Sequence, residues 1–315
     1  MNDDPLHVTN GDSVVQTIER AGLPGRGLSW IDVLSEGPVP AGLDAAALAR
    51  VRAEAAEALG WAPADEVVAA YGERDAALEA ADHVVLWFEH DLHDQLQLVQ
   101  ILDRLAAGRR GRRLEAVIVD RVPGRETFHG LGELEPEELA DLWPDRRPID
   151  PAQLALAQRA WAALREPDPT ALAALVREGT PTLPLLGPAL ERLLEELPDA
   201  GDGLARSERQ LLRAVGAGAR TPLDAFDADA EQEEARHAGD TTVFARLDRL
   251  AAGPHPLLSG PPDGQLELTP DGERVLTGEV DAVRLRGLDR WVGGTHLTPD
   301  AAWRWDAATR DVVRG

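Results

Sequence analysis

The chain has 315 residues, a length that suits two or three domains better than one small core. Its net charge of -24 means that most of its surface repels polyanions such as duplex DNA. It has no cysteine, which excludes disulfides, zinc-thiolate sites and a thiol nucleophile. Residues 1–5 are acidic, unlike a secretory signal, and no stretch approaches the ~20 apolar residues that span a bilayer. We therefore expect a cytoplasmic protein without a membrane segment.

Strands alternate with helices at the start of the chain. Residues 6–9 are β-prone, and residues 14–21 have the apolar spacing of a helix. In the turn between them, Gly11 permits a positive φ, and Asp12 or Ser13 is expected to cap the helix. This pattern predicts a strand, a tight loop and a helix.

The alternation continues to about residue 120. A second strand is expected over residues 28–34, and two helices between residues 42 and 81. Residues 83–88 form a continuous apolar run, typical of a strand buried on both faces of a parallel sheet. An amphipathic helix then extends to Gly108, and residues 114–120 supply a fourth strand. The chain is therefore predicted to begin with an α/β fold, a Rossmann-like, mostly parallel sheet with helices on both faces.

The remainder is predicted to be mostly helical. Residues 134–198 show only helical patterns, interrupted by prolines. Later helices, including one at residues 241–250, lead into two short strands, 257–259 and 266–268, joined by a Gly- and Pro-rich loop. Helices followed by a hairpin are typical of a winged helix-turn-helix.

These patterns divide the chain into four parts. The predicted parts are a Rossmann-like α/β domain (1–125), a helical region (126–203), a winged-helix-like module (204–279) and a tryptophan-containing tail that packs on the rest (280–315). Between residues 204 and 278 there are 8 arginines against 13 acidic residues. This balance favours a packing, protein-contact or dimerisation role for the module and disfavours nucleic-acid binding without excluding it.

Polar residues follow the predicted strands. In open α/β sheets, ligands bind outside the carboxyl ends of the strands, where helix amino termini favour anions. The residues that reach this edge are Asn10, Gly11, Asp12, Ser13, Asp32, Glu36, Glu89, His90, Asp91, His93, Asp94, Gln95, Asp120 and Arg121. So many carboxylates at one edge repel one another unless protons or a hard cation such as Mg²⁺ or Mn²⁺ neutralise them.

This edge predicts metal-assisted chemistry on a phosphorylated or nucleotide-like substrate, catalysed by a hydrolase or transferase. The expected metal ligands are Asp12, Asp32 and Asp91. The expected catalytic residues are Glu89, His90 and Asp91, with His90 as general acid or base. The expected substrate-binding residues are Asn10, Gly11, Ser13, Asp94 and Gln95. No NAD or ATP motif is found, because the three-glycine fingerprint is missing and a chain without lysine has no phosphate-binding Gly-Lys-Ser/Thr loop.

Three alternatives stay open. Asp12, Ser13, Asp91 and Asp94 all occupy positions where helix caps and first-turn acids are favoured for structural reasons alone. The protein could be a non-catalytic regulator or adaptor whose winged-helix-like module binds a protein or nucleic acid. It could also be a sensor that binds a nucleotide without turnover.

Several motifs in the first ~120 residues resemble the bacterial family called domain of unknown function 1835 (DUF1835). They are His7-Val8-Thr9-Asn10-Gly11-Asp12-Ser13, the segment from Asp32 to Glu36-Gly37-Pro38, and Trp87 with Glu89-His90-Asp91-Leu92-His93-Asp94-Gln95-Leu96. Gly130-Leu131-Gly132, the helix at Ser207 and the tail segment Gly293-Gly294-Thr295-His296-Leu297 resemble the carboxyl-terminal extension of longer members. The resemblance implies a common fold and a shared residue set, and no established activity.

Overall fold

The computed structural model describes residues 4–108, 111–260 and 265–315. Its main sheet has five strands: β1 (Leu6–Thr9), β2 (Arg26–Ser29), β3 (His83–Glu89), β4 (Arg113–Val119) and β5 (Arg147–Pro148). Their order is β2-β1-β3-β4-β5. The first four strands are parallel, and the short edge strand β5 is antiparallel to β4. The predicted mostly parallel N-terminal sheet is confirmed.

The position of β3 within the sheet explains why its sequence is apolar throughout. Its side chains alternate between two hydrophobic clusters, one on each face of the sheet. Val85 and Trp87 belong to one cluster, and Val84, Leu86 and Phe88 to the other. Because both faces are covered, every position from Val84 to Phe88 is fully buried.

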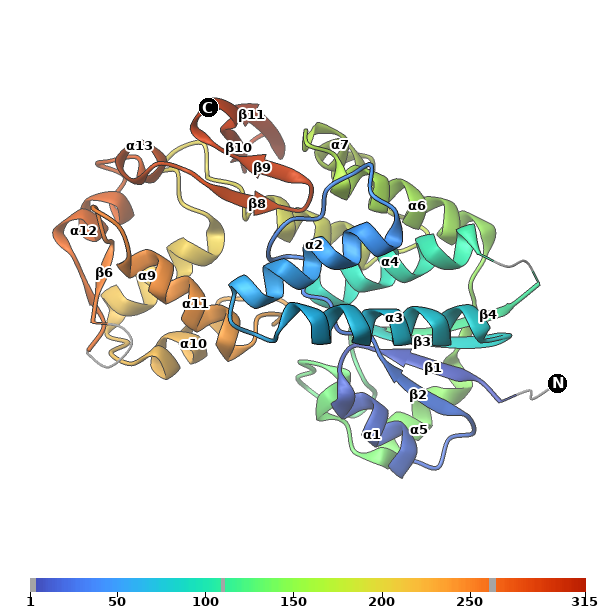
Figure 1. The fold of residues 1–315 in the computed structure, drawn as a ribbon. Coiled ribbons are helices and arrows are strands. Elements are labelled where there is room, and N and C mark those ends of the chain that lie inside the picture. Colours follow the sequence, from blue (N-terminus) through green and yellow to red (C-terminus); the bar gives the residue numbers. More distant parts are fainter. Residues whose placement is uncertain (1–3, 109–110, 261–264) are drawn as a thin grey trace.

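Helices cover both faces of the sheet (Figure 1). On one face lie α1 (Asp12–Arg20) and α5 (Pro136–Leu142), which contact each other. On the other face lie α3 (Ala64–Ala80) and α4 (Leu92–Ala107), with α2 (Ala45–Ala58) against α3. Short 3-10 helices span Leu131–Glu133, Trp143–Asp145 and Pro299–Ala301.

Three further helices extend the second layer. They are α6 (Pro151–Arg165), α7 (Thr170–Glu178) and α8 (Leu186–Leu194). Helices α6 and α8 pack on α4, and α7 packs on both. Their buried leucines join the same cluster as one face of the sheet, so this hydrophobic core continues across residue 125. The predicted helical region is confirmed, except that residues 134–198 also contain the short edge strand β5, which was not predicted.

The C-terminal unit has a separate hydrophobic cluster that includes Leu204, Leu211, Val243 and Leu257. Its elements are α9 (Arg206–Ala217), α10 (Pro222–Ala230), α11 (Asp240–Ala251), β6 (Leu258–Ser259), β7 (Glu267–Leu268), α12 (Pro270–Leu276) and α13 (Ala282–Arg286). Strands β6 and β7 pair antiparallel, as expected, although residues 261–264 of the predicted loop lie outside the described residues.

The tail forms two small antiparallel sheets. They comprise β8 (Arg290–Val292) with β9 (Thr295–Leu297), and β10 (Trp303–Asp306) with β11 (Asp311–Arg314). Trp303 and Trp305 are buried in the same cluster as helices α4 and α6 to α8. The tail is therefore part of the main core.

The second strand corrects the sequence-based expectation. It was predicted over residues 28–34 but spans Arg26–Ser29. The backbone N–H of Trp30 still donates to the backbone carbonyl of Thr9 in β1, and the chain then leaves the sheet. Trp30 and Leu34 are fully buried beneath the helices, so the apolar pattern reflects a buried loop.

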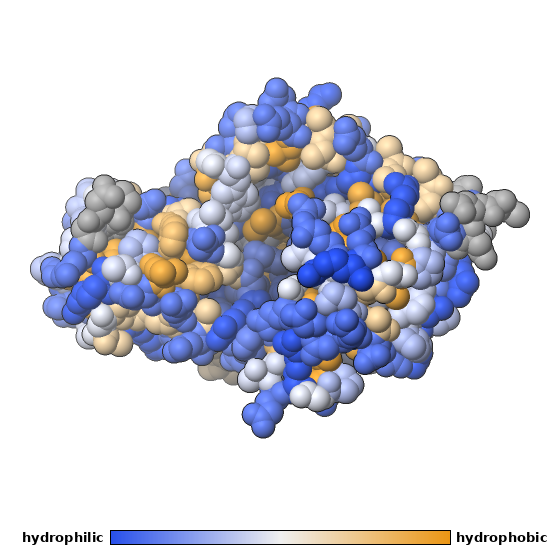
Figure 2. Space-filling model, turned by 90° about the horizontal axis from the view of Figure 1, so that it is seen from below, coloured by the Kyte–Doolittle hydropathy of each residue, from blue (hydrophilic) through white to orange (hydrophobic). Residues whose placement is uncertain are grey.

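One face of the molecular surface shows how hydrophilic and hydrophobic residues are distributed (Figure 2). The face in Figure 2 is mostly hydrophilic, with hydrophobic residues in patches between hydrophilic ones. Among the described residues, no helix is both long enough and apolar enough to span a membrane.

Candidate functional site

The strand order places a crevice between β1 and β3. These strands are neighbours, and the connections that follow them lead to opposite faces of the sheet, to α1 after β1 and to α4 after β3. Such a reversal is the position at which open α/β sheets bind ligands, outside the carboxyl ends of the strands. Asn10 follows β1 and Glu89 ends β3, so the polar residues of both segments meet there.

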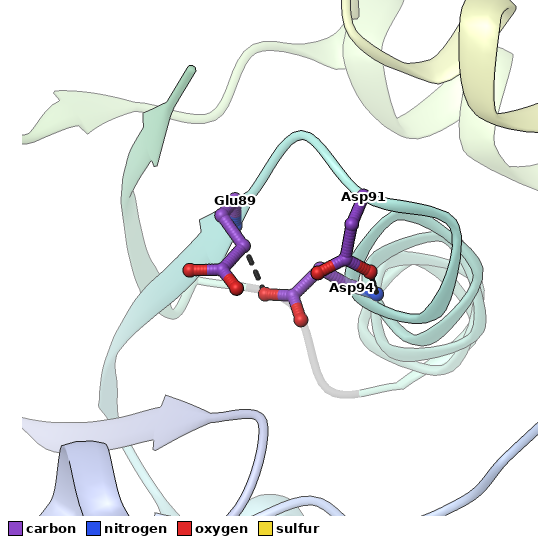
Figure 3. A group of neighbouring side chains, drawn as sticks. All are labelled: Glu89, Asp91 and Asp94. Atoms are coloured by element: carbon purple, nitrogen blue, oxygen red, sulfur yellow. Dashed lines mark hydrogen bonds between the residues drawn. The ribbon is translucent and has the colours of Figure 1, made fainter. Parts of the chain in front are cut away.

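Three carboxylates come together at this point. Glu89, Asp91 and Asp94 each offer an oxygen, and these three oxygens lie within 4.8 Å of one another (Figure 3). Glu89 is the last residue of β3, Asp91 is the N-cap of α4, and Asp94 lies in the first turn of α4. Asp91 and Asp94 are buried, and Glu89 is partly buried. We call these three residues the acidic triad.

Hydrogen bonds hold the triad in place. Asp91 Oδ1 accepts from the backbone N–H of Asp94 at 3.0 Å, which caps α4. Asp94 Oδ1 accepts from the backbone N–H of Glu89 at 2.9 Å, and Asp94 Oδ2 accepts from Asn10 Nδ2 at 2.6 Å. Gln95 Nε2 donates to the backbone carbonyl of Glu89. The triad therefore links the ends of β1 and β3 to the start of α4.

The carboxyl groups of the triad resist ionisation. Burial, followed by repulsion from Asp94 and Asp91, raises the pKa of Glu89 to about 10. Burial raises the pKa of Asp91 to about 6. Burial and the charge of Asp91 raise the pKa of Asp94 well above its usual range. A cluster in which each carboxylate disfavours the charge of the next favours a proton or a cation between them.

A cavity of about 250 Å³ opens beside the triad. Asn10, Ser13, Glu89 and Asp94 line it, together with residues 129–133 from the loop after β4. The backbone N–H of Leu131 donates to Glu89 Oε2. A Cβ atom at Gly130 would lie only 2.5 Å from Glu89 Oε1, so glycine permits the close approach of this loop.

The structure revises the predicted metal ligands. Asp91 belongs to the triad, but Asp12 and Asp32 do not. Asp12 is exposed on α1. Asp32 is buried, and its carboxylate accepts from Arg52 Nε at 2.9 Å and from Gln100 Nε2 at 3.2 Å. Its charge is therefore neutralised by a structural ion pair. The residues that lie beside Asp91 are Glu89 and Asp94.

Only some of the predicted substrate-binding residues line the cavity. Asn10, Ser13 and Asp94 line the cavity, whereas Gln95 binds the backbone behind it. Gly11 is the N-cap of α1, with a φ of 77°, and no side chain caps this helix. The expectation that Asp12 or Ser13 caps α1 is therefore wrong, because both residues already lie within the helix.

The histidines are arranged differently from the prediction. The His90 ring stacks on Phe128 at 6.0 Å, its buried Nδ1 has no hydrogen-bond partner in the described chain, and it is not among the residues lining the cavity. His129 does line the cavity and was not selected from the sequence. The only sequence pattern near it was the Gly130-Leu131-Gly132 motif. His93 lies elsewhere, with Nε2 2.8 Å from Ser35 Oγ, and burial lowers its pKa to about 4.

Three other edge residues lie outside the cavity and form ion pairs. Glu36 Oε1 is 2.7 Å from Arg246 Nη2, and Asp120 pairs with its neighbour Arg121. These side chains therefore do not belong to the cavity beside the triad.

No protein-family model matches the chain, and none of the curated proteins is significantly similar to it. The chemistry must therefore be inferred from the geometry of the acidic triad and its cavity.

Proposed function

We propose that the acidic triad binds Mg²⁺ or Mn²⁺ and that the protein is a hydrolase or transferase acting on a phosphorylated or nucleotide-like substrate. The observation that carries the proposal is the convergence of three carboxylate oxygens within 4.8 Å beside a cavity at the β1–β3 crevice. Carboxylate oxygens are the ligands that hard divalent cations prefer, and such a cation would remove the mutual repulsion of the triad.

The surroundings of the triad suit a phosphate group. The first N–H groups of α1 have no side-chain cap, and helix amino termini bind anions. Asn10 and Ser13 add an amide and a hydroxyl at the cavity wall. The volume of about 250 Å³ is below the usual range for drug-sized ligands, so it suits the phosphate and its nearest atoms, with the rest of the substrate outside.

Each residue of the site then has a role. Glu89, Asp91 and Asp94 would hold the metal, and Asn10 and Ser13 would orient the phosphate. A bound metal would activate water and stabilise the charge of the phosphate during transfer. We assign proton transfer to His129 in place of His90, because His129 lines the cavity. The DUF1835 resemblance fits this site, since its motifs contain Asn10, Ser13 and the triad.

A second candidate function concerns residues 204–279, for which we propose a winged-helix-like module. Its support is the order of three helices, α9 to α11, followed by the β6–β7 hairpin. In that arrangement α11 would be the recognition helix, but Arg246 of α11 is buried and paired with Glu36. A role in protein contact or regulation therefore fits better than DNA binding.

A thermal-shift screen tests the enzymatic proposal. Phosphorylated metabolites and nucleotides are added with and without Mg²⁺ or Mn²⁺ to the wild type, to Asp94→Asn and to Asp12→Asn. We expect metal-dependent stabilisation of the wild type, of about 2.7 kcal/mol at a ligand concentration 100 times Kd. This stabilisation should be lost in Asp94→Asn and kept in Asp12→Asn. Asp12→Asn is the matched control, because it also replaces one carboxylate by an amide, at the exposed start of α1.

Two outcomes would reject the enzymatic proposal. One is that no compound stabilises the wild type in a metal-dependent manner. The other is that Asp94→Asn responds as the wild type does. Either result would leave the regulatory alternative as the better account.

A further inference from the structure

A larger cavity lies apart from the acidic triad. It is a cleft of about 650 Å³ between the loop and helix that follow β2 and the C-terminal unit with strand β8. Small-molecule sites usually have volumes of about 300–1,000 Å³. The residues that line this cleft are different from those that line the cavity beside the triad.

Arginine side chains line one part of this cleft, although the chain as a whole is strongly acidic. They are Arg249, Arg286 and Arg290. Four carboxylates also line the cleft, and each already has a partner. Glu196 pairs with Arg192, and Asp289 Oδ1 lies 2.8 Å from His296 Nε2. Glu36 accepts from Arg246 at 2.7 and 3.0 Å. Glu208 Oε2 accepts from the backbone N–H of Ala205 at 2.9 Å, and its Oε1 is 3.2 Å from Arg290 Nη1.

Arg286 has unused hydrogen-bonding capacity. Its Nη2 donates to the backbone carbonyls of Arg249 and Ala252, at 2.6 and 3.2 Å, at the end of α11. Within the described chain, its Nε and Nη1 form no hydrogen bond and no carboxylate pairs with it. The buried Nε of Arg290 also has no partner among the described residues. An anion in the cleft would supply the missing acceptors, and such charge-assisted bonds are the strong ones.

Apolar side chains line other parts of the cleft. Ala55, Ala58 and Leu59, at the end of α2, form one wall. Trp291 lines the cleft too, and its ring stacks on His296 with centroids 4.4 Å apart and planes 2° apart. Apolar walls around a few polar groups are typical of small-molecule sites.

We propose that this cleft binds an organic anion, a carboxylate or phosphate ester, whose charged group binds Arg286 and Arg290 and whose apolar body lies against α2 and Trp291. The proposal is independent of the acidic triad. It is therefore tested on protein from which divalent metal has been removed with a chelating resin, so that its outcome does not depend on the proposed enzymatic function. EDTA is left out of the sample because it is itself an organic carboxylate and would compete for the cleft.

Ligand-observed NMR provides the test, with benzoate and phenyl phosphate as probes and benzyl alcohol as the neutral probe. We expect at least one anion to bind the wild type saturably and benzyl alcohol to bind ~10-fold more weakly or not at all, which corresponds to about 1.4 kcal/mol. The anion that binds identifies the preferred charged group. Arg286→Gln should weaken anion binding ~10-fold or more. Arg284→Gln should not, because Arg284 is exposed on the same helix and does not line the cleft.

A second variant guards against misfolding of Arg286→Gln. Ala58→Trp places a large side chain in the cleft from the opposite wall, at an exposed position of α2. It should weaken anion binding while both arginines remain. The proposal fails if neither anion binds saturably, if benzyl alcohol binds equally well, or if the Arg284 and Arg286 variants weaken binding to the same extent. It also fails if Ala58→Trp folds and binds the anion like the wild type.

Discussion

Individual residues of the acidic triad have structural roles that leave room for the proposed metal. Asp91 caps α4 with one carboxylate oxygen, and Asp94 accepts hydrogen bonds from Glu89 and Asn10. A carboxylate has about four lone-pair positions, so capping a helix leaves room for a metal. The interpretation of Asp91 as a helix cap is confirmed, and it is compatible with the proposed metal site.

Glu89 should reduce the stability of the metal-free protein at neutral and alkaline pH. Its pKa rises from an ordinary 4.5 to about 10 on folding. The folded state therefore holds a proton that the unfolded state releases above pH 4.5, so stability falls as pH rises from about 4.5 to 10. Glu89→Gln cannot ionise, so we expect it to unfold with a free energy ~1 kcal/mol or more above that of the wild type at pH 8. A pKa shift of one unit corresponds to about 1.4 kcal/mol.

Urea unfolding in EDTA, at several pH values, measures this difference. The gain of Glu89→Gln over the wild type should be small near pH 5 and should increase toward pH 9. Glu126→Gln, at an exposed position, is the control and should show no such trend. A gain that is absent or independent of pH would show that Glu89 is not held in its protonated form by the triad.

The residues of the site were predictable in part. Asn10, Ser13, Glu89, Asp91 and Asp94 were selected because polar residues at the carboxyl ends of parallel strands meet at one edge. Asp32 was misassigned, because its partner Arg52 lies on a different element and only the folded chain brings them together. His129 was missed because the loop after β4 folds back over β3, which local sequence patterns do not reveal.

At the level of elements, the strands with both faces buried were the most predictable. Strand β3 was correct because continuous burial imposes a continuous apolar run. Strand β2 was misplaced because buried loop residues such as Trp30 are as apolar as strand residues. The tail strands β8 to β11, which have three or four residues each and pair in two small antiparallel sheets, were not predicted.

The loop over the triad yields a second prediction. A Cβ atom at Gly130 would lie 2.5 Å from Glu89 Oε1, so Gly130→Ala should displace the loop or the carboxylate. We expect metal affinity to fall ~10-fold, which corresponds to about 1.4 kcal/mol. Gly72→Ala is the matched control, because a Cβ at this helical position meets no atom within 4 Å. Calorimetric titration with Mn²⁺ compares the two variants, and equal affinities would contradict the account.

At the scale of the whole molecule, the N-terminal sheet is one wall of a larger core. Helices α6 to α8 and the tail tryptophans share a cluster with one face of the sheet, a second cluster lies on its other face, and the C-terminal unit has a third. That unit is joined to the loop after β2 by the ion pair of buried Arg246 with partly buried Glu36. Patterns within single segments indicated the elements, but the sharing of one core depends on contacts across the chain.

The most direct test of the central claim is Mn²⁺ binding, followed by the electron paramagnetic resonance of free Mn²⁺. We predict one site per wild-type chain, displaced by Mg²⁺, with affinity reduced ~10-fold or more in Asp94→Asn and unchanged in Asp12→Asn. If the wild type binds no Mn²⁺, or if Asp94→Asn binds it equally well, the acidic triad is not a metal site.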